Sequence, residues 1–294
     1  MSALQLNAAA AGAFTLGGDL NVNRLGYGAM RIVGKGVWGP SEDKPAALAT
    51  LRRAVELGVN LIDTADSYGP HVSEELIAEA LHPYPAGLVI ATKAGWERVG
   101  PGQWIHNASP AHLTKALEGS LKRLRLDRID VFQLHIPDPA VSFDASMECL
   151  AQHREAGKIR HVGLSNVALE YVERARRLVP IVSVQNRYSF ADREWDFVVD
   201  YCARHDIGFM PWAPLGQVRL ASEALDRAAR QLNATRMQVG LAWLLKRAKN
   251  ILPIPGTSNV GHLEENVAAA ALQLPDDTFD ELSAMSSPHA VLRG

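Results

Sequence analysis

The amino-acid sequence predicts a (β/α)₈ barrel, an α/β fold of the TIM-barrel type, with an N-terminal β-hairpin that closes the bottom of the barrel. Short β-rich runs alternate with longer helical stretches from about residue 24 onward, and there are eight such runs. No linker or low-complexity segment divides the chain of 294 residues. Alternation of this kind is typical of parallel βαβ units, and eight units match the barrel. An open, doubly wound sheet is the alternative.

The expected strands are rich in aliphatic and β-branched residues and are bounded by turn-forming residues. They cover residues 24–28, 60–63, 87–93, 129–135, 158–164, 181–185, 208–212 and 251–255. The stretches between them carry apolar residues at helical spacing, as in Leu113, Ala116, Leu117 and Leu121. Ser109-Pro110 precedes that stretch, and a serine N-cap followed by proline is typical of a helix start.

The N-terminal region is expected to hold a flexible tail over residues 1–13, followed by a single barrel domain over residues 14–294. Residues 14–22 form two short apolar runs around Gly17-Gly18-Asp19, which predicts a hairpin. We expect this hairpin to plug the barrel, because an open barrel end would leave apolar side chains in water.

The composition indicates a small-molecule protein. The chain is 47% hydrophobic and 21% charged, and its net charge of −2 with scattered Lys and Arg gives no footprint for nucleic acid or a membrane surface. No apolar run is long enough to span a bilayer. Cys149 and Cys202 have no CxxC or CxxH spacing, so buried thiols in a reducing cytoplasm are expected rather than a disulfide or a metal site.

One segment, Gly34-Lys35-Gly36-Val37-Trp38-Gly39, matches the literal pattern GxGxxG of dinucleotide-binding Rossmann folds. In that fold the pattern follows a strand and opens a helix. Here Pro40, Ser41 and Pro45 follow, so the helix is expected to start only near residue 45. A glycine-rich loop at the mouth of the barrel is the favoured interpretation.

Polar and aromatic residues stand at the carboxyl ends of most expected strands, where barrel enzymes keep their chemistry. They are Asp63, Tyr68, Lys93, His135, Ser165, Asn166, Gln185 and Trp212. Each has a structural alternative: Asp63 and Lys93 as an ion pair, His135 as a core histidine, Trp212 as apolar filling and Tyr68 as a loop aromatic. Burying such groups is costly unless they are paired or have a function, so their position at one rim of the barrel favours a single site.

These residues and their neighbours resemble the aldo-keto reductase superfamily. The similarity lies in Ile62-Asp63-Thr64-Ala65-Asp66-Ser67-Tyr68-Gly69, Ala91-Thr92-Lys93, Gln133-Leu134-His135, Gly163-Leu164-Ser165-Asn166, Val184-Gln185-Asn186 and Pro211-Trp212-Ala213-Pro214-Leu215-Gly216. It runs from about residue 23 to residue 270. The resemblance implies an NADPH-dependent oxidoreductase that reduces aldehydes or ketones, with pyridoxal-like compounds among the candidate substrates.

The resemblance assigns catalysis to Tyr68, Lys93, Asp63 and His135. Tyr68 would donate the proton to the carbonyl oxygen, and Lys93, paired with Asp63, is expected to lower the pKa of Tyr68. His135 would hydrogen-bond the carbonyl oxygen as a neutral imidazole. A regulatory sensor of the same fold and an NAD-linked dehydrogenase are alternatives. A sugar-cleaving barrel would need two carboxylates facing each other across the site, and only Asp63 and Asp66 lie near the rim.

The resemblance also implies the cofactor and substrate contacts. The cofactor-binding residues would be Gly28, Ala29, Met30, Ser165, Asn166, Gln185, Trp212, Ala213, Pro214, Leu215, Gly216, Gln217, Gly256, Ser258, His262, Glu265 and Asn266. Many family members carry cations at the positions of Gly256 and His262, so Ser258, His262 and Arg219 remain to read the 2′-phosphate, and a modest preference for NADPH is expected. The aromatic candidates for the substrate wall are Trp38, Trp96, Trp104 and His106, with loop anchoring as their alternative role.

Overall fold

The structure is a computed structural model, and it describes residues 6–215 and 223–285. Its centre is a sheet of seven parallel strands in the order β11-β10-β9-β8-β5-β4-β3. Their bounds are β3 Tyr27–Gly28, β4 Leu61–Asp63, β5 Val89–Ala94, β8 Ile129–Leu134, β9 Ile159–Ser165, β10 Ile181–Gln185 and β11 Gly208–Phe209. These strands fall within or overlap seven of the eight expected ranges.

The eighth expected strand, residues 251–255, closes the sheet into a barrel. Ile251 forms a parallel bridge with Phe209 of β11, and Leu252 N donates to Phe209 O at 2.8 Å. On the other side, Gly26 N donates to Pro253 O at 2.9 Å. Pro253 and Pro255 carry no N–H, so on the β3 side this segment pairs only through its carbonyls, and it is not a regular strand. The closure excludes the open doubly wound sheet.

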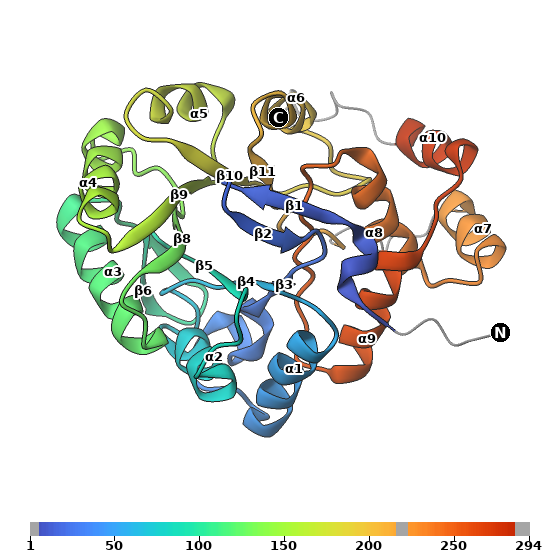
Figure 1. Cartoon of the computed structure of the whole chain (residues 1–294), viewed down its shortest axis with the longest axis horizontal. Coiled ribbons are helices and arrows are strands. Elements are labelled where there is room, and N and C mark those ends of the chain that lie inside the picture. The colour runs from blue at the N-terminus through green and yellow to red at the C-terminus, as the bar shows by residue number, and fades with distance from the viewer. Residues whose placement is uncertain (1–5, 216–222, 286–294) are drawn as a thin grey trace.

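The described part of the chain has ten helices. They are α1 Lys44–Glu56, α2 Val72–Leu81, α3 Pro110–Leu124, α4 Phe143–Glu155, α5 Leu169–Ala175, α6 Asp196–Arg204, α7 Glu223–Gln231, α8 Arg236–Arg247, α9 Val260–Ala268 and α10 Asp276–Ala284. Figure 1 shows most of them around the sheet, with α7 and α10 outside α8. Helix α3 begins as expected, since the Ser109 hydroxyl accepts from His112 N and Pro110 is the first helical residue.

The segment with the GxGxxG pattern is a loop. It holds one short 3₁₀ helix, Lys35–Val37, and helix α1 begins only at Lys44. The side chain of Asp43 caps that helix by accepting from Ala46 N at 2.9 Å. The Rossmann interpretation is therefore excluded, and the loop interpretation holds.

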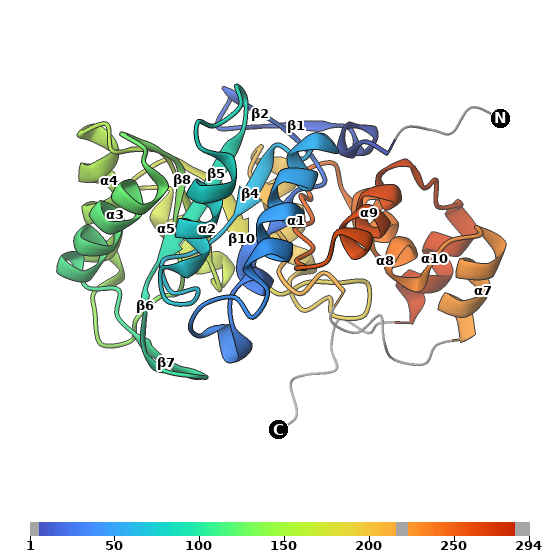
Figure 2. The same ribbon diagram turned by 90° about the horizontal axis from the view of Figure 1, so that it is seen from below.

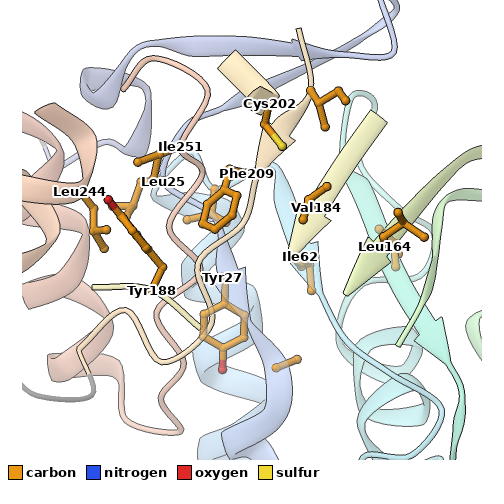
Figure 3. Packing of buried hydrophobic residues seen from close by; sticks show 14 of the residues in the cluster. Leu25, Tyr27, Ile62, Leu164, Val184, Tyr188, Cys202, Phe209, Leu244 and Ile251 are labelled. Carbon is orange, nitrogen blue, oxygen red and sulfur yellow. The ribbon is translucent and has the colours of Figure 1, made fainter. Parts of the chain in front are cut away.

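Two apolar cores lie on the two faces of the barrel sheet. The larger one packs the helices against the outside of the strands, and Figure 3 shows it near the closure, where Tyr188 and Phe209 lie beside Ile251. The smaller one fills the inside of the barrel with side chains such as Val89, Val131 and Leu252. Cys149 and Cys202 are free and buried, and Cys202 belongs to the outer core.

The N-terminal hairpin, β1 Ala13–Leu16 and β2 Leu20–Asn23, is present as expected. Leu16, Leu20 and Val22 are buried in the inner core, which they close from the amino-terminal end of the strands. A second hairpin, β6 Trp96–Gly100 and β7 Gln103–His106, projects from the opposite end, as Figure 2 shows.

Part of the expected N-terminal tail is ordered. Ala8–Ala11 form a 3₁₀ helix, Ala8 is fully buried, and Ala8 N donates to Leu57 O at 2.8 Å. The ordered structure therefore starts earlier than residue 14, because small alanine side chains fit against the end of helix α1 and need no polar partner. Across the described residues, no helix is long and apolar enough to cross a membrane.

The turn of the N-terminal hairpin yields a stability prediction. Gly17 and Gly18 both have a positive φ, but a Cβ on Gly17 would lie 2.3 Å from the His161 ring, whereas one on Gly18 meets nothing within 4 Å. His161 is held in place by Asp19 at 2.5 Å, so it cannot move away freely. We expect Gly18→Ala to cost about 1–2 kcal/mol of unfolding free energy. Gly17→Ala should cost about 1–3 kcal/mol more, as overpacking does.

Urea unfolding of the two variants measures this difference directly. Gly18→Ala serves as the matched control, because it carries the same backbone penalty without the contact. Equal destabilisation of the two variants would show that the hairpin does not pack against His161.

Candidate active site

The carboxyl ends of the barrel strands surround a cavity of about 1080 Å³. It lies at the end of the barrel away from the N-terminal hairpin. Most residues that the sequence analysis assigned to a site line this cavity. They are Gly28, Met30, Asp63, Tyr68, Trp96, Trp104, His135, Ser165, Asn166, Gln185, Trp212, Ala213, Pro214, Leu215, Gly256, Ser258, His262 and Asn266.

Five assigned residues do not line the cavity. Ala29 and Lys93 are fully buried behind its wall. Trp38 and His106 pack behind the wall against Arg98 and Trp96, respectively. Glu265 turns away, and its carboxylate accepts from the Thr235 hydroxyl at 2.6 Å. The remaining assigned residues, Gly216 and Gln217, and the suggested cation Arg219 lie outside the described residues.

The Asp63 carboxylate is the centre of a buried polar network. Asp63 ends β4 and is 2% exposed, while Lys93 of β5 is fully buried. The Lys93 ammonium donates to Asp63 Oδ1 at 2.6 Å, and it also donates to Thr64 O at 2.8 Å. The other oxygen, Oδ2, accepts from the side-chain amides of Gln133 at 3.2 Å and Gln185 at 2.8 Å. Strands β4, β5, β8 and β10 therefore meet at one carboxylate.

Tyr68 and His135 lie side by side on the cavity wall, above this network. Their rings meet edge to face with centroids 5.9 Å apart, and each residue is 6% exposed. The Lys93 ammonium lies 5.3 Å from the centroid of the Tyr68 ring. The Ser67 hydroxyl lies 3.5 Å from Nδ1 of His135, within weak hydrogen-bonding distance.

The environment holds both groups in their neutral forms. Burial, together with the negative charges of Asp63 and Asp66, raises the pKa of Tyr68 well above its usual value. The sequence analysis expected a lowered pKa for Tyr68, but burial disfavours the phenolate and the net shift is upward. Burial and the charge of Lys93 lower the pKa of His135 well below its usual value.

A second buried carboxyl, Asp66, lies in the same loop as Tyr68. It is 4% exposed, and its Oδ1 has no hydrogen-bond partner among the described residues. Burial and the nearby charge of Glu74 raise the pKa of Asp66 well above its usual range. Glu74 itself is paired with Arg123 at 2.7 Å, so its own charge is compensated.

Ser165, Asn166 and Trp212 form the next part of the wall. The amide nitrogen of Asn166 donates to His135 O and to the Ser165 hydroxyl, both at 3.0 Å. The Asn166 side-chain oxygen accepts from the Trp212 indole N–H at 3.0 Å. Trp212 is 36% exposed, so a flat surface faces the cavity beside these polar groups.

The far end of the cavity is shaped by close contact of two backbone segments. A Cβ on Gly28 would lie 2.6 Å from Ile254 O, and a Cβ on Gly256 would lie 2.6 Å from Gly28 O, so only glycine fits at either position. The side chain of Arg31 lies against Gly256 and lines the cavity with Ser258. Arg31 is exposed, and no described side chain pairs with it.

Sequence reasoning missed several wall residues, including Arg31, Ile136, Met237 and Thr257. Arg31 and Ile136 directly follow assigned residues, so extending those segments by one position would have found them. Met237 lies on helix α8, which bears no recognisable site pattern.

The family of the chain follows from comparison with known proteins. The sequence model of the aldo/keto reductase family matches residues 24–287. A pyridoxine 4-dehydrogenase of Escherichia coli (strain K12) is 46% identical over 280 residues, which cover 93% of this chain and 98% of that protein. An uncharacterized oxidoreductase of Schizosaccharomyces pombe is 46% identical over 267 residues, which cover 90% of this chain and 87% of that protein.

Solved structures give the same result. A thermostable aldo-keto reductase in complex with the inhibitor epalrestat superposes with a TM-score of 0.82 at 29% identity, over 93% of this chain and 99% of that one. An aldo-keto reductase of Klebsiella pneumoniae in complex with NADPH superposes with a TM-score of 0.79 at 25% identity, over 94% and 95%. The chain belongs to the aldo/keto reductase family of oxidoreductases.

Proposed function

We propose that this protein reduces aldehydes or ketones to alcohols with NADPH, and that Tyr68 supplies the proton. One observation carries the proposal: the phenol of Tyr68 and the imidazole of His135 stand side by side on a cavity wall, beside the buried ion pair of Lys93 and Asp63. When bound, NADPH supplies the hydride to the carbonyl carbon.

Tyr68 acts as the general acid. The phenol carries its proton at neutral pH, since an ordinary tyrosine has a pKa of about 10 and this pKa is raised, and it would donate the proton as charge develops on the carbonyl oxygen. Since the acid of the reduction is the base of the reverse oxidation, Tyr68 would serve both directions of the reaction.

His135 positions the carbonyl oxygen beside the Tyr68 hydroxyl. Its lowered pKa keeps the imidazole uncharged, so it offers a hydrogen bond without competing as an acid. Lys93 and Asp63 act behind the wall. The charge of Asp63 adds to the upward pKa shift of Tyr68, and the charge of Lys93 adds to the downward shift of His135.

The described cavity fits a nicotinamide dinucleotide. Trp212 would stack on the nicotinamide ring, and Ser165 with Gln185 would bind its carboxamide. The contact between Gly28 and Gly256 brings two backbones close to the place where the phosphates would lie. The Klebsiella pneumoniae structure in complex with NADPH supports this cofactor. A regulatory sensor of this fold would keep the binding groups, but the complete Tyr68 and His135 pair favours an enzyme.

Arg31 would take the place of the missing cations at the 2′-phosphate. The Arg31 side chain lies beside Gly256 on the cavity wall, and Ser258 and His262 complete a set of donors. A guanidinium without a carboxylate partner is free to bind a phosphate through two parallel hydrogen bonds.

The relative from Escherichia coli supports a pyridine ring in the substrate. Its name, pyridoxine 4-dehydrogenase, denotes oxidation of an aromatic alcohol, and reduction of the matching aldehyde is the reverse reaction. Trp96 and Trp104 lie on the cavity wall close to His135, where they would contact such a ring. We therefore include pyridoxal-like aldehydes among the substrates.

The first test removes the proton donor. Tyr68→Phe should lower kcat for aldehyde reduction by about 10² or more, the scale of losing a general acid. The affinity for NADPH, measured by quenching of tryptophan fluorescence, should stay nearly unchanged. If the variant kept most of its activity, another group would have to donate the proton.

The pH profile tests the two shifted pKa values. Reduction needs protonated Tyr68 and neutral His135, so kcat/KM should be flat between the ordinary histidine value of about 6.5 and the ordinary tyrosine value of about 10. The acid limb should lie below this window, because the pKa of His135 is lowered, and the alkaline limb above it. A limb inside the window that disappears in His135→Asn or Tyr68→Phe would contradict the assignment.

Cofactor choice tests Arg31. We expect a preference for NADPH over NADH in kcat/KM of about tenfold to a hundredfold, equivalent to about 1.4–2.8 kcal/mol. Arg31→Met should remove most of this preference by weakening NADPH, while NADH kinetics change little. An equal fall in kcat/KM with both cofactors would show that Arg31 binds the phosphates that both cofactors share and not the 2′-phosphate.

A further inference from the structure

Arg98 is a buried arginine in the hairpin β6–β7 that the catalytic scheme above does not use. It is 9% exposed, and no carboxylate among the described residues pairs with it. Its guanidinium donates instead to four backbone carbonyls: Nε to Gln103 at 3.2 Å, Nη2 to Gly36 at 3.0 Å, and Nη1 to both Val37 at 2.8 Å and Ser67 at 3.0 Å.

These four carbonyls belong to three separate segments of the chain. Gln103 lies in the same hairpin as Arg98, Gly36 and Val37 lie in the glycine-rich loop after β3, and Ser67 directly precedes Tyr68. The glycine-rich loop also touches the catalytic segment through its backbone, since Gly39 N donates to Gly69 O at 2.7 Å. The Arg98 side chain therefore joins the hairpin β6–β7 and the glycine-rich loop to the segment that carries Tyr68.

The faces of the guanidinium contact two of the assigned aromatic residues. Its central carbon lies 3.7 Å from the ring centroid of Trp104, its cross-strand partner, and 5.6 Å from that of Trp38. Trp104 in turn meets Trp96 edge to face at 5.7 Å, and the Trp96 ring lies 6.4 Å from that of His135. These contacts connect Arg98 to His135 through the rings of Trp104 and Trp96.

The cost of burying Arg98 indicates what the arrangement secures. A buried guanidinium without a counter-ion is expensive unless its donors are satisfied, and four carbonyls satisfy it only while both loops hold their present positions. A planar fork with fixed donor directions fits such a set of acceptors, whereas the compact ammonium of lysine does not. The glycine-rich loop that resembles a nucleotide motif is thus an acceptor site for this arginine.

We propose that Arg98 is a positioning residue that sets substrate selectivity by fixing Trp104 and Trp96 beside His135. It does not touch the substrate. It holds the hairpin β6–β7 and the glycine-rich loop against the segment that carries Tyr68. The indole rings of Trp104 and Trp96, fixed in this way, accept a planar aromatic carbonyl compound. This inference rests on the proposed reductase function.

The test compares one aromatic and one small aliphatic aldehyde, pyridine-4-carbaldehyde and propanal, at saturating NADPH. In Arg98→Met, the ratio of kcat/KM for the aromatic to the aliphatic aldehyde should fall at least about tenfold, mainly through KM of the aromatic aldehyde. Arg98→Lys should lower the ratio as well, because one ammonium cannot span the four carbonyls. Arg160→Met is the matched control: Arg160 ties the other hairpin to the barrel through Asp19 at 2.8 Å, and its loss should leave the ratio unchanged.

A ratio that stays within about twofold of the wild type in Arg98→Met, even with both rates lowered, would overturn the proposal and leave Arg98 with a purely structural role. If that variant does not fold, Trp104→Leu decides the same point, since an unchanged ratio would show that the indole wall does not select the substrate. A wild type that reduces propanal but not the aromatic aldehyde would overturn this inference alone. A wild type that reduces neither would overturn the proposed function with it.

Discussion

The carboxylate of Asp63 is buried at the end of the barrel, and compensation of its charge constrains the rest of the site. Lys93 provides the counter-charge, and the amides of Gln133 and Gln185 satisfy the second oxygen. These partners come from three other strands, so the register of the sheet and the network depend on each other. A buried ion pair of this kind is stable only while all of its hydrogen bonds are kept.

Tyr68 and His135 lie above this pair, and both side chains are buried. Burial is therefore the largest influence on both Tyr68 and His135, and it shifts the pKa of the acid upward and that of the base downward. Both become neutral at physiological pH, which is the state that proton donation to a carbonyl oxygen requires.

The two hairpins lie at opposite ends of the barrel and are held in different ways. At one end, the N-terminal hairpin seals the inner core with Leu16, Leu20 and Val22. At the other end, the hairpin β6–β7 carries aromatic side chains to the cavity and is held by Arg98 rather than by a large apolar core. The barrel strands separate the two hairpins, and of the two only the second contributes side chains to the cavity wall.

The sequence by itself determined the barrel, its N-terminal hairpin and the residues at the strand ends, because alternation of apolar runs and the position of Asp63, Tyr68 and His135 are local properties. It did not determine that Arg31 lies against Gly256, or that Arg98 joins three segments, since those contacts bring together residues far apart in the chain. The direction of the Tyr68 pKa shift also depended on the tertiary structure. The sequence names the charged neighbours, but burial and the existing pairing of Lys93 decide which influence is larger.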